Sequence, residues 1–235
     1  MKIKYIQKTT LIDYPDEIAC TIFLFGCNFR CGFCYNPELV IKEKTPDLNE
    51  KSVLDFLKKR ENQLSAVCFT GGEPLISLKT NFLEEIRKLG YKIKIDTNGS
   101  FPEKLKEIIS KKLVDYISMD VKTTKEDYEK IVRTKVDIKK IEESMKIISC
   151  LENYEFRTTV IERLHDKEKV LEIVKWIYSV IGKKIKNYCL QGFTNKGKFI
   201  DNSFLKEKNT GEIFLNELKE LIEREKICDK IIIRK

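Results

Sequence analysis

The sequence is short of histidine and of long apolar runs, and both shortages exclude classes of protein. No stretch of eighteen consecutive apolar residues occurs in the 235 residues, so we expect no membrane-spanning helix. The opening residues, MKIKYIQKTTLIDYP, lack the apolar core of a signal peptide, which favours a cytoplasmic protein. The single histidine, His165, cannot supply the matched Cys and His pairs of a structural zinc site. Because it precedes a predicted helix start at Asp166, we expect it on the surface.

The composition is that of a globular protein with a basic surface. Hydrophobic residues make up 42%, charged residues 35%, and the formal net charge is +8. No repeat or linker divides the chain, which predicts one domain over 1–235, with a core over about 18–193, an N-terminal extension over 1–17 and a C-terminal helical region over 194–235. The charge excess is spread along predicted helices, so we expect a solvated surface or a face for an acidic protein, and no nucleic acid or membrane partner.

Hydrophobic periodicity predicts alternating strands and helices. The predicted strands cover 18–25, 65–70, 91–99, 114–122, 154–161 and 186–193, and the helices between and after them cover 48–63, 78–90, 102–113, 137–153, 166–182 and 210–226. This alternation predicts an α/β fold with a parallel sheet. Six strands fall short of a closed eight-stranded barrel, so a partial barrel and a doubly wound sheet both remain. Either one places functional groups at the carboxyl ends of the strands.

Three of the eight cysteines, Cys27, Cys31 and Cys34, directly follow the first predicted strand with the spacing C-x3-C-x2-C. Three thiolates leave a tetrahedral zinc site incomplete, whereas a 4Fe–4S cluster held by three cysteines keeps one iron open to a ligand. The remaining cysteines stand alone in apolar or helical stretches, and we expect them to be buried thiols: Cys20, Cys68, Cys150, Cys189 and Cys228.

The segments GCNFRCGFCYNPEL and LIDYPDEIACTIFLFGCNFRC resemble the radical S-adenosylmethionine (SAM) superfamily, within it the activating enzymes of glycyl-radical proteins. The similarity is strongest to the activators of anaerobic ribonucleoside-triphosphate reductase. It is clearest over residues 9–40 and recurs at strand ends to about residue 193. Residues 194–235 carry no recognisable motif.

The resemblance implies a partial (βα)6 barrel and an oxidoreductase with a 4Fe–4S cluster and SAM as cofactors. In this family the reduced cluster passes an electron to the SAM sulfonium, and cleavage gives a 5′-deoxyadenosyl radical. That radical would remove hydrogen from a glycine of a partner such as an anaerobic ribonucleotide reductase or a pyruvate formate-lyase-like enzyme. A flavodoxin- or ferredoxin-like protein would supply the electron.

The resemblance also assigns cofactor contacts near the first two strand ends. Phe33 stands where relatives place an aromatic residue against the adenine, and Tyr35 stands where relatives often carry histidine. In CFTGGEPL, Gly71, Gly72 and Glu73 resemble the loop that holds the methionine amino group. Read alone, two glycines and a proline fit an ordinary turn equally well.

Polar residues at later strand ends complete the predicted cofactor site. These residues are Asp96, Asn98, Asp120, Lys122 and Arg157, and in some activators groups like Asp96, Thr97 and Asp120 hold a monovalent cation. Four of the five have a structural alternative: a turn at Asn98, an ion pair between Asp120 and Lys122, and a structural acid opposite Arg157.

Two other functions are compatible with parts of this pattern. A radical SAM enzyme acting on a small molecule, such as a deazapurine precursor, shares the cluster and cofactor motifs. A non-enzymatic redox or zinc module would need neither GGEP nor charges at the strand ends. The DYP and YNPEL sequences, and the absence of a second cysteine-rich region, favour the activating enzyme.

Overall fold

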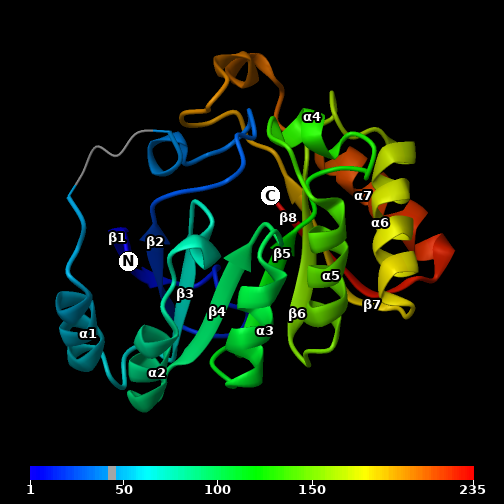
Figure 1. Cartoon of the computed structure of the whole chain (residues 1–235). Coiled ribbons are helices and arrows are strands. Elements are labelled where there is room, and N and C mark those ends of the chain that lie inside the picture. The colour runs from blue at the N-terminus through cyan, green and yellow to red at the C-terminus, as the bar shows by residue number, and fades with distance from the viewer. Residues whose placement is uncertain (42–45) are drawn as a thin grey trace. The chain divides into compact units, whose positions relative to one another are not determined.

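Strands and helices alternate along the chain in the computed structural model, which describes residues 1–41 and 46–235 (Figure 1). Strand order follows chain order, from β1 to β8. The strands are β1 (Ile3–Thr10), β2 (Ala19–Leu24), β3 (Ala66–Gly71), β4 (Lys92–Thr97), β5 (Tyr116–Asp120), β6 (Tyr154–Val160), β7 (Ile185–Gly192) and β8 (Cys228–Arg234).

Seven α-helices lie in the described part of the chain. They are α1 (Glu50–Lys59), α2 (Thr80–Lys88), α3 (Pro102–Ser110), α4 (Tyr128–Val132), α5 (Ile138–Ser149), α6 (Lys167–Ile181) and α7 (Glu212–Glu225). Several ends follow predicted local signals. The Asp166 carboxylate accepts a hydrogen bond from the Lys169 N–H and caps α6, and Gly90 follows α2 with a positive φ of 84°.

The six predicted strands and six predicted helices are all present, and the structure adds β1, β8 and the short helix α4. β1 pairs antiparallel with β2, whereas β8 pairs parallel with β7. The predicted C-terminal helical region over 194–235 contains the helix α7, and it ends in the strand β8. In β8 the apolar run is only Ile231 to Ile233, flanked by charges, which is too short a pattern to identify a strand from sequence.

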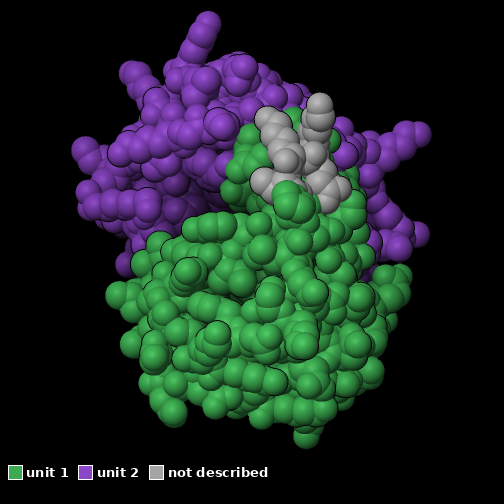
Figure 2. All heavy atoms as spheres, turned by 90° about the vertical axis from the view of Figure 1, so that its left-hand side faces the viewer, with its two compact units in different colours: residues 1–28, 36–97, 103–117 green, residues 29–35, 98–102, 118–235 purple. Residues whose placement is uncertain are grey.

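Contacts divide the chain into two compact units, which Figure 2 colours separately. Unit 1 comprises residues 1–28, 36–97 and 103–117. Its strands β2, β3 and β4 run parallel, with Ile22, Phe69 and Ile95 in register, and Phe82 of α2 packs against Phe69 at 6.4 Å between ring centroids. Thr21, Cys68 and Lys94 are in register on the opposite face.

Unit 2 comprises residues 29–35, 98–102 and 118–235. Strands β6, β7 and β8 run parallel in it. The buried Tyr128 of α4 contacts Phe29 at 6.2 Å and Trp176 of α6 at 6.0 Å between ring centroids. No helix of the described residues has the length and apolarity needed to cross a bilayer.

Candidate active site

The end of β2 leads directly into the three clustered cysteines, and in unit 1 the GGEP loop packs against this point. The Gly72 N–H donates to the Leu24 carbonyl at 2.9 Å, and the Glu73 N–H donates to the Gly26 carbonyl at 2.7 Å. A Cβ on Gly72 would lie 2.1 Å from the Gly26 oxygen, and one on Gly71 would lie 2.4 Å from the Leu24 oxygen. The two glycines therefore bring the β3 loop against the chain just before Cys27.

Glu73 and Thr97 join the ends of β3 and β4. The Glu73 side chain is 1% exposed, and its Oε1 accepts hydrogen bonds from the Leu75 N–H at 3.1 Å and the Thr97 hydroxyl at 2.9 Å. Beside them, the buried Lys94 ammonium forms an ion pair with Asp96. The predicted residues Glu73 and Asp96 thus both lie at strand ends of unit 1, each with a protein partner.

We define the cysteine loop as residues 27–35, of which residues 29–35 lie in unit 2. Cys31 is 8% exposed and Cys34 is half-buried, and the Cys34 N–H closes a turn on the Cys31 carbonyl at 3.1 Å. The Arg30 N–H donates to the Val132 carbonyl at the end of α4, at 2.8 Å. Phe33 is buried against Phe204, and the Tyr35 hydroxyl accepts a hydrogen bond from the Thr194 N–H at 2.9 Å.

The isolated cysteines are poor candidates for metal ligands. Burial raises the pKa of Cys20 and of Cys189 to about 12, and burial also raises the pKa of Cys68. Because their pKa values are raised, these three cysteines keep their protons at neutral pH. A thiol must lose its proton to bind a metal, so they are poor ligands. The prediction of burial is confirmed for them but wrong for Cys150, which is exposed because it lies just beyond the end of α5.

Asn98 forms the turn that the Asn-Gly pair predicts. Its Oδ1 accepts hydrogen bonds from the Ser100 N–H at 3.0 Å and the Ser100 hydroxyl at 2.5 Å. Gly99 follows with φ of 79°, and a Cβ there would lie 2.1 Å from Met119 Cε. The predicted turn at Asn98 is therefore present in unit 2.

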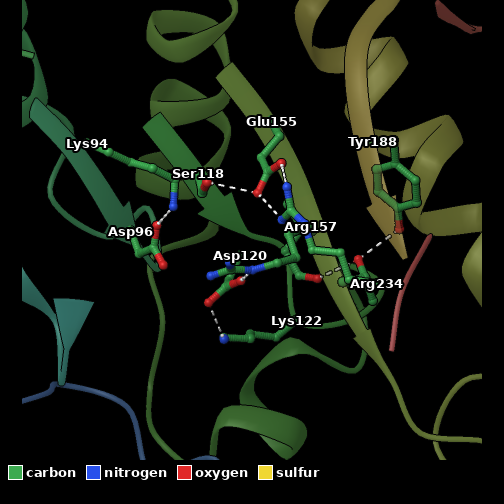
Figure 3. A network of polar contacts seen from close by, with 11 residues as sticks. Lys94, Asp96, Ser118, Asp120, Lys122, Glu155, Arg157, Tyr188 and Arg234 are labelled. Carbon is green, nitrogen blue, oxygen red and sulfur yellow. Dashed lines mark hydrogen bonds and ion pairs between the residues drawn. The ribbon is translucent and has the colours of Figure 1, made fainter. Parts of the chain in front are cut away.

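Three charged side chains meet where β5 ends beside the middle of β6 (Figure 3). The Asp120 carboxylate pairs with Lys122 Nζ at 2.8 Å and with Arg157 Nε at 2.6 Å. Burial alone would raise the pKa of Asp120, but the positive charges of Arg157 and Lys122 outweigh it and hold that pKa below its usual range. All three groups are therefore charged at neutral pH, and this triad carries a net charge of +1.

Two of the structural alternatives to cofactor binding are present: the ion pair between Asp120 and Lys122, and the acid opposite Arg157. The structure shows that one carboxylate serves both cations. A carboxylate between two cations is held in one orientation, and an excess positive charge favours a carboxylate ligand nearby.

His165 is a part of this region that the sequence did not reveal. It is completely buried, so the prediction of a surface histidine is wrong. Its Nδ1 accepts a hydrogen bond from the Ile161 N–H at 3.1 Å, and its Nε2 lies 3.0 Å from the Lys122 carbonyl, to which it donates. Burial lowers the pKa of His165 to about 4, which keeps the ring neutral. His165 therefore ties the end of β6 to the end of β5.

A second buried ion pair anchors β8. Glu155 of β6 is fully buried, and its two carboxylate oxygens accept from Arg234 at 2.6 and 2.7 Å (Figure 3). The Ser118 hydroxyl donates to the same carboxylate at 2.8 Å. Glu155 stands between Tyr154 and Phe156 in the sequence, which was the available signal, because a carboxylate buried among aromatic residues needs a cation.

Comparison with known proteins gives consistent matches. The family model described as the radical SAM superfamily matches residues 21–177. A protein of Methanocaldococcus jannaschii, whose name assigns it provisionally to the glycyl-radical enzyme activating enzymes, is 34% identical over 97% of this chain and 94% of its own length. The pyruvate formate-lyase-activating enzyme of Clostridium pasteurianum is 32% identical over 57% of this chain and 58% of its own length.

A relative with a different activity also matches. The 7-carboxy-7-deazaguanine synthase of Archaeoglobus fulgidus is 27% identical over 69% of this chain and 68% of its own length. Among solved structures, Streptococcus suis SuiB has a TM-score of 0.65 at 15% identity, covering 92% of this chain and 50% of that one. The structure of anSMEcpe with bound AdoMet has a TM-score of 0.59 at 16% identity, covering 90% of this chain and 61% of that one. The predicted α/β partial barrel is thereby confirmed, with β1 and β8 in addition.

Proposed function

The chain belongs to the radical SAM superfamily, whose members are enzymes that use a 4Fe–4S cluster and S-adenosylmethionine, and we propose that it activates a glycyl-radical protein. The observation that carries this proposal is the 34% identity, over nearly the whole of both chains, to a relative named for that activity. The DYP sequence at residues 13–15, before β2, and the YNPEL sequence at residues 35–39, which follows the last of the three cysteines, support the same function.

Cys27, Cys31 and Cys34 are the proposed cluster ligands. None of them is in a disulfide, the loop around them is polar, and thiolates are the donors that iron–sulfur clusters prefer. Of the described residues, no three Cys, His, Asp or Glu side chains are already gathered as a metal site, so the support comes from spacing, donor chemistry and family. When bound, the cluster supplies the electron that cleaves SAM and yields a carbon radical.

The chain's own residues would bind and orient SAM at the strand ends. The close approach of Gly71 and Gly72 to β2 leaves the GGEP backbone beside Cys27, where an ammonium group can be held. In unit 2, the Asp120–Lys122–Arg157 triad offers fixed charges for the polar groups of SAM. Phe33, Tyr35, Glu73, Asp96 and Asn98 remain predicted contacts. A monovalent cation also remains a prediction, and the Lys94 ammonium already neutralises Asp96.

The proposed reaction transfers one hydrogen atom. The Cα–H bond of a glycine in the partner breaks, the hydrogen joins the 5′-carbon of the deoxyadenosyl radical, and 5′-deoxyadenosine and a glycyl radical remain. The electron comes from a flavodoxin- or ferredoxin-like protein, which the chain's net charge of +8 would attract if that protein is acidic. The proposed location is the cytoplasm, in accord with eight cysteines of which none is in a disulfide.

Anaerobic mixing with a candidate partner tests this function. The reconstituted protein, SAM, a reductant and a glycyl-radical protein encoded near its gene should give a glycine-centred doublet in electron paramagnetic resonance, with 5′-deoxyadenosine formed in step. A Cys31→Ala variant should give neither signal.

Action on a small molecule is the second candidate, favoured by the likeness to a deazaguanine synthase. Under the same conditions, turnover of a purine or pterin precursor without a protein radical from any partner would establish this alternative and reject the activating function.

A further inference from the structure

Residues 193–206, which carry no sequence motif, return onto the cysteine loop within unit 2. We name them the cover segment; they follow β7 and end in the short 3-10 helix Asn202–Lys206. The Asp201 N–H donates to the Gly32 carbonyl at 3.0 Å, and the Asp201 carboxylate forms an ion pair with Arg133. Arg133 directly follows α4, whose Val132 carbonyl accepts from the Arg30 N–H. The loop is thus held by hydrogen bonds from two distant parts of the chain.

Aromatic rings strengthen this attachment. Phe33 meets Phe204 edge to face at 5.9 Å between centroids. Tyr35 stacks on Phe193 at 5.9 Å and contacts Phe199 at 5.5 Å. Phe193, Phe199 and Phe204 are each at most 5% exposed, so the cover segment has an apolar centre of its own. Aromatic contacts of this kind stabilise beyond the area they bury.

Gly32 shows how closely the cover segment fits. A Cβ at this position would lie 2.7 Å from Phe204 Cε2 and 2.9 Å from Arg133 Cζ. The residue between Cys31 and Phe33 therefore has no room for a methyl group while the cover segment stays in place.

We propose that Asp201, Phe204 and Arg133 are positioning residues, which hold Cys31 and Cys34 in the conformation that binds the cluster and limit access of solvent and oxidants to these two sulfurs. The inference deepens the proposed function, because it rests on Cys31 and Cys34 being cluster ligands. Its consequence is that opening of the cover segment exposes thiols that the closed segment protects.

Thiol alkylation of the cluster-free protein under anaerobic conditions tests the proposal without any catalytic activity. Iodoacetamide labelling, followed peptide by peptide by mass spectrometry, should accelerate at Cys31 and Cys34 about tenfold in Phe204→Ala and about threefold in Asp201→Asn. The exposed Cys150 is an internal reference that should not change, and the buried Cys189 reports global unfolding.

The matched control is Glu217→Gln, which removes a half-exposed ion pair with Lys167 elsewhere in unit 2. It should leave Cys31 and Cys34 at their original labelling rates.

If Phe204→Ala does not fold, Phe204→Leu keeps most of the volume and should accelerate labelling less, with the same site selectivity. The charge-reversed pair Arg133→Asp with Asp201→Arg should restore protection that either single change removes.

The stability of the cluster in air provides a second measurement. In air, the absorbance of the reconstituted cluster should decay several-fold faster in Phe204→Ala than in the original protein or in Glu217→Gln. Unchanged labelling at Cys31 and Cys34, or equal acceleration at Cys189, would overturn the proposal. Site-selective labelling without a glycyl radical in any partner would support the positioning role while rejecting only the activating function.

Discussion

The strand ends of unit 1 and of unit 2 are built by different means. At the ends of β2 and β3, backbone meets backbone, and glycines at positions 71 and 72 make that approach possible. Where β5 ends beside the middle of β6, charged side chains meet around Asp120, and a buried histidine joins the backbones just beyond the two strands. Substitutions should therefore act through steric conflict in the first region and through electrostatics in the second.

The largest effect should come from Gly72→Ala. The added methyl would collide with the Gly26 carbonyl, which belongs to the backbone and cannot rotate away. We expect a loss of about 4 kcal/mol in the free energy of unfolding and little iron after reconstitution. Urea unfolding of the cluster-free protein and iron analysis measure these losses.

Gly90→Ala is the control for that prediction, since its Cβ meets no atom within 4 Å although φ is 84°. It should cost only about 1 kcal/mol, from backbone strain, and keep full iron. Equal behaviour of the two variants would show that close approach is not what Gly72 provides.

Asp120→Asn should have the next largest effect, because it leaves Lys122 and Arg157 facing each other without a counter-charge. We expect a loss of about 3 kcal/mol and at least tenfold weaker SAM binding, with the cluster retained. Calorimetry measures the affinity for SAM, and the absorbance of the cluster shows whether the cluster is retained.

Adding Arg157→Gln to Asp120→Asn restores the net charge of +1 and should recover part of the stability but none of the SAM affinity. Undiminished SAM affinity in Asp120→Asn would place the cofactor away from the triad.

His165 should make stability depend on pH in a specific window. Its pKa is about 4 when folded and about 6.5 when unfolded, so between these values the unfolded chain binds more protons. Stability therefore rises with pH across this window, is fully present above about 6.5, and is lost as pH falls through 4. At about 1.4 kcal/mol per pH unit, the effect is on the order of 3 kcal/mol.

His165→Gln should flatten that pH dependence and keep most of the SAM affinity, because its amide can replace both hydrogen bonds. His165→Leu should flatten it equally but weaken SAM binding several-fold. The pKa of His165 also depends on the charges of Asp127, Asp166 and Lys169. Unfolding curves of Asp127→Asn at several pH values measure how much one of these charges contributes to the pH dependence. The same slope in His165→Leu and the original protein would assign the pH dependence to other groups.

Tyr35→Phe should have the smallest effect. The change removes the acceptor for the Thr194 N–H but keeps the stacking on Phe193, so a loss of about 1 kcal/mol is expected. SAM affinity should change less than threefold if the hydroxyl serves the cover segment. A tenfold loss of affinity would instead support the predicted cofactor contact.

Much of the fold was predictable because its signals are local. Alternating apolar runs gave all six central strands and their helices, and Asp166 and Gly90 marked helix ends correctly. β1 and β8 were missed because an edge strand and a short apolar run have weak periodicity. Their strand form depends on pairing with a neighbouring strand: β1 pairs with β2, which follows it closely in sequence, and β8 pairs with β7 across a long connection.

The sequence by itself determined the cysteine spacing, the GGEP loop, the turn at Asn98 and the order of strands and helices, since each depends on residues close together in the chain. Only the tertiary structure decided that Asp120 pairs with Arg157, that His165 is buried between two strand ends, and that residues 193–206 lie on the cysteine loop. The contacts between these elements join residues 37 to 171 positions apart, from Asp120–Arg157 to Phe33–Phe204, and burial and charge neutralisation select them only after the strands have packed.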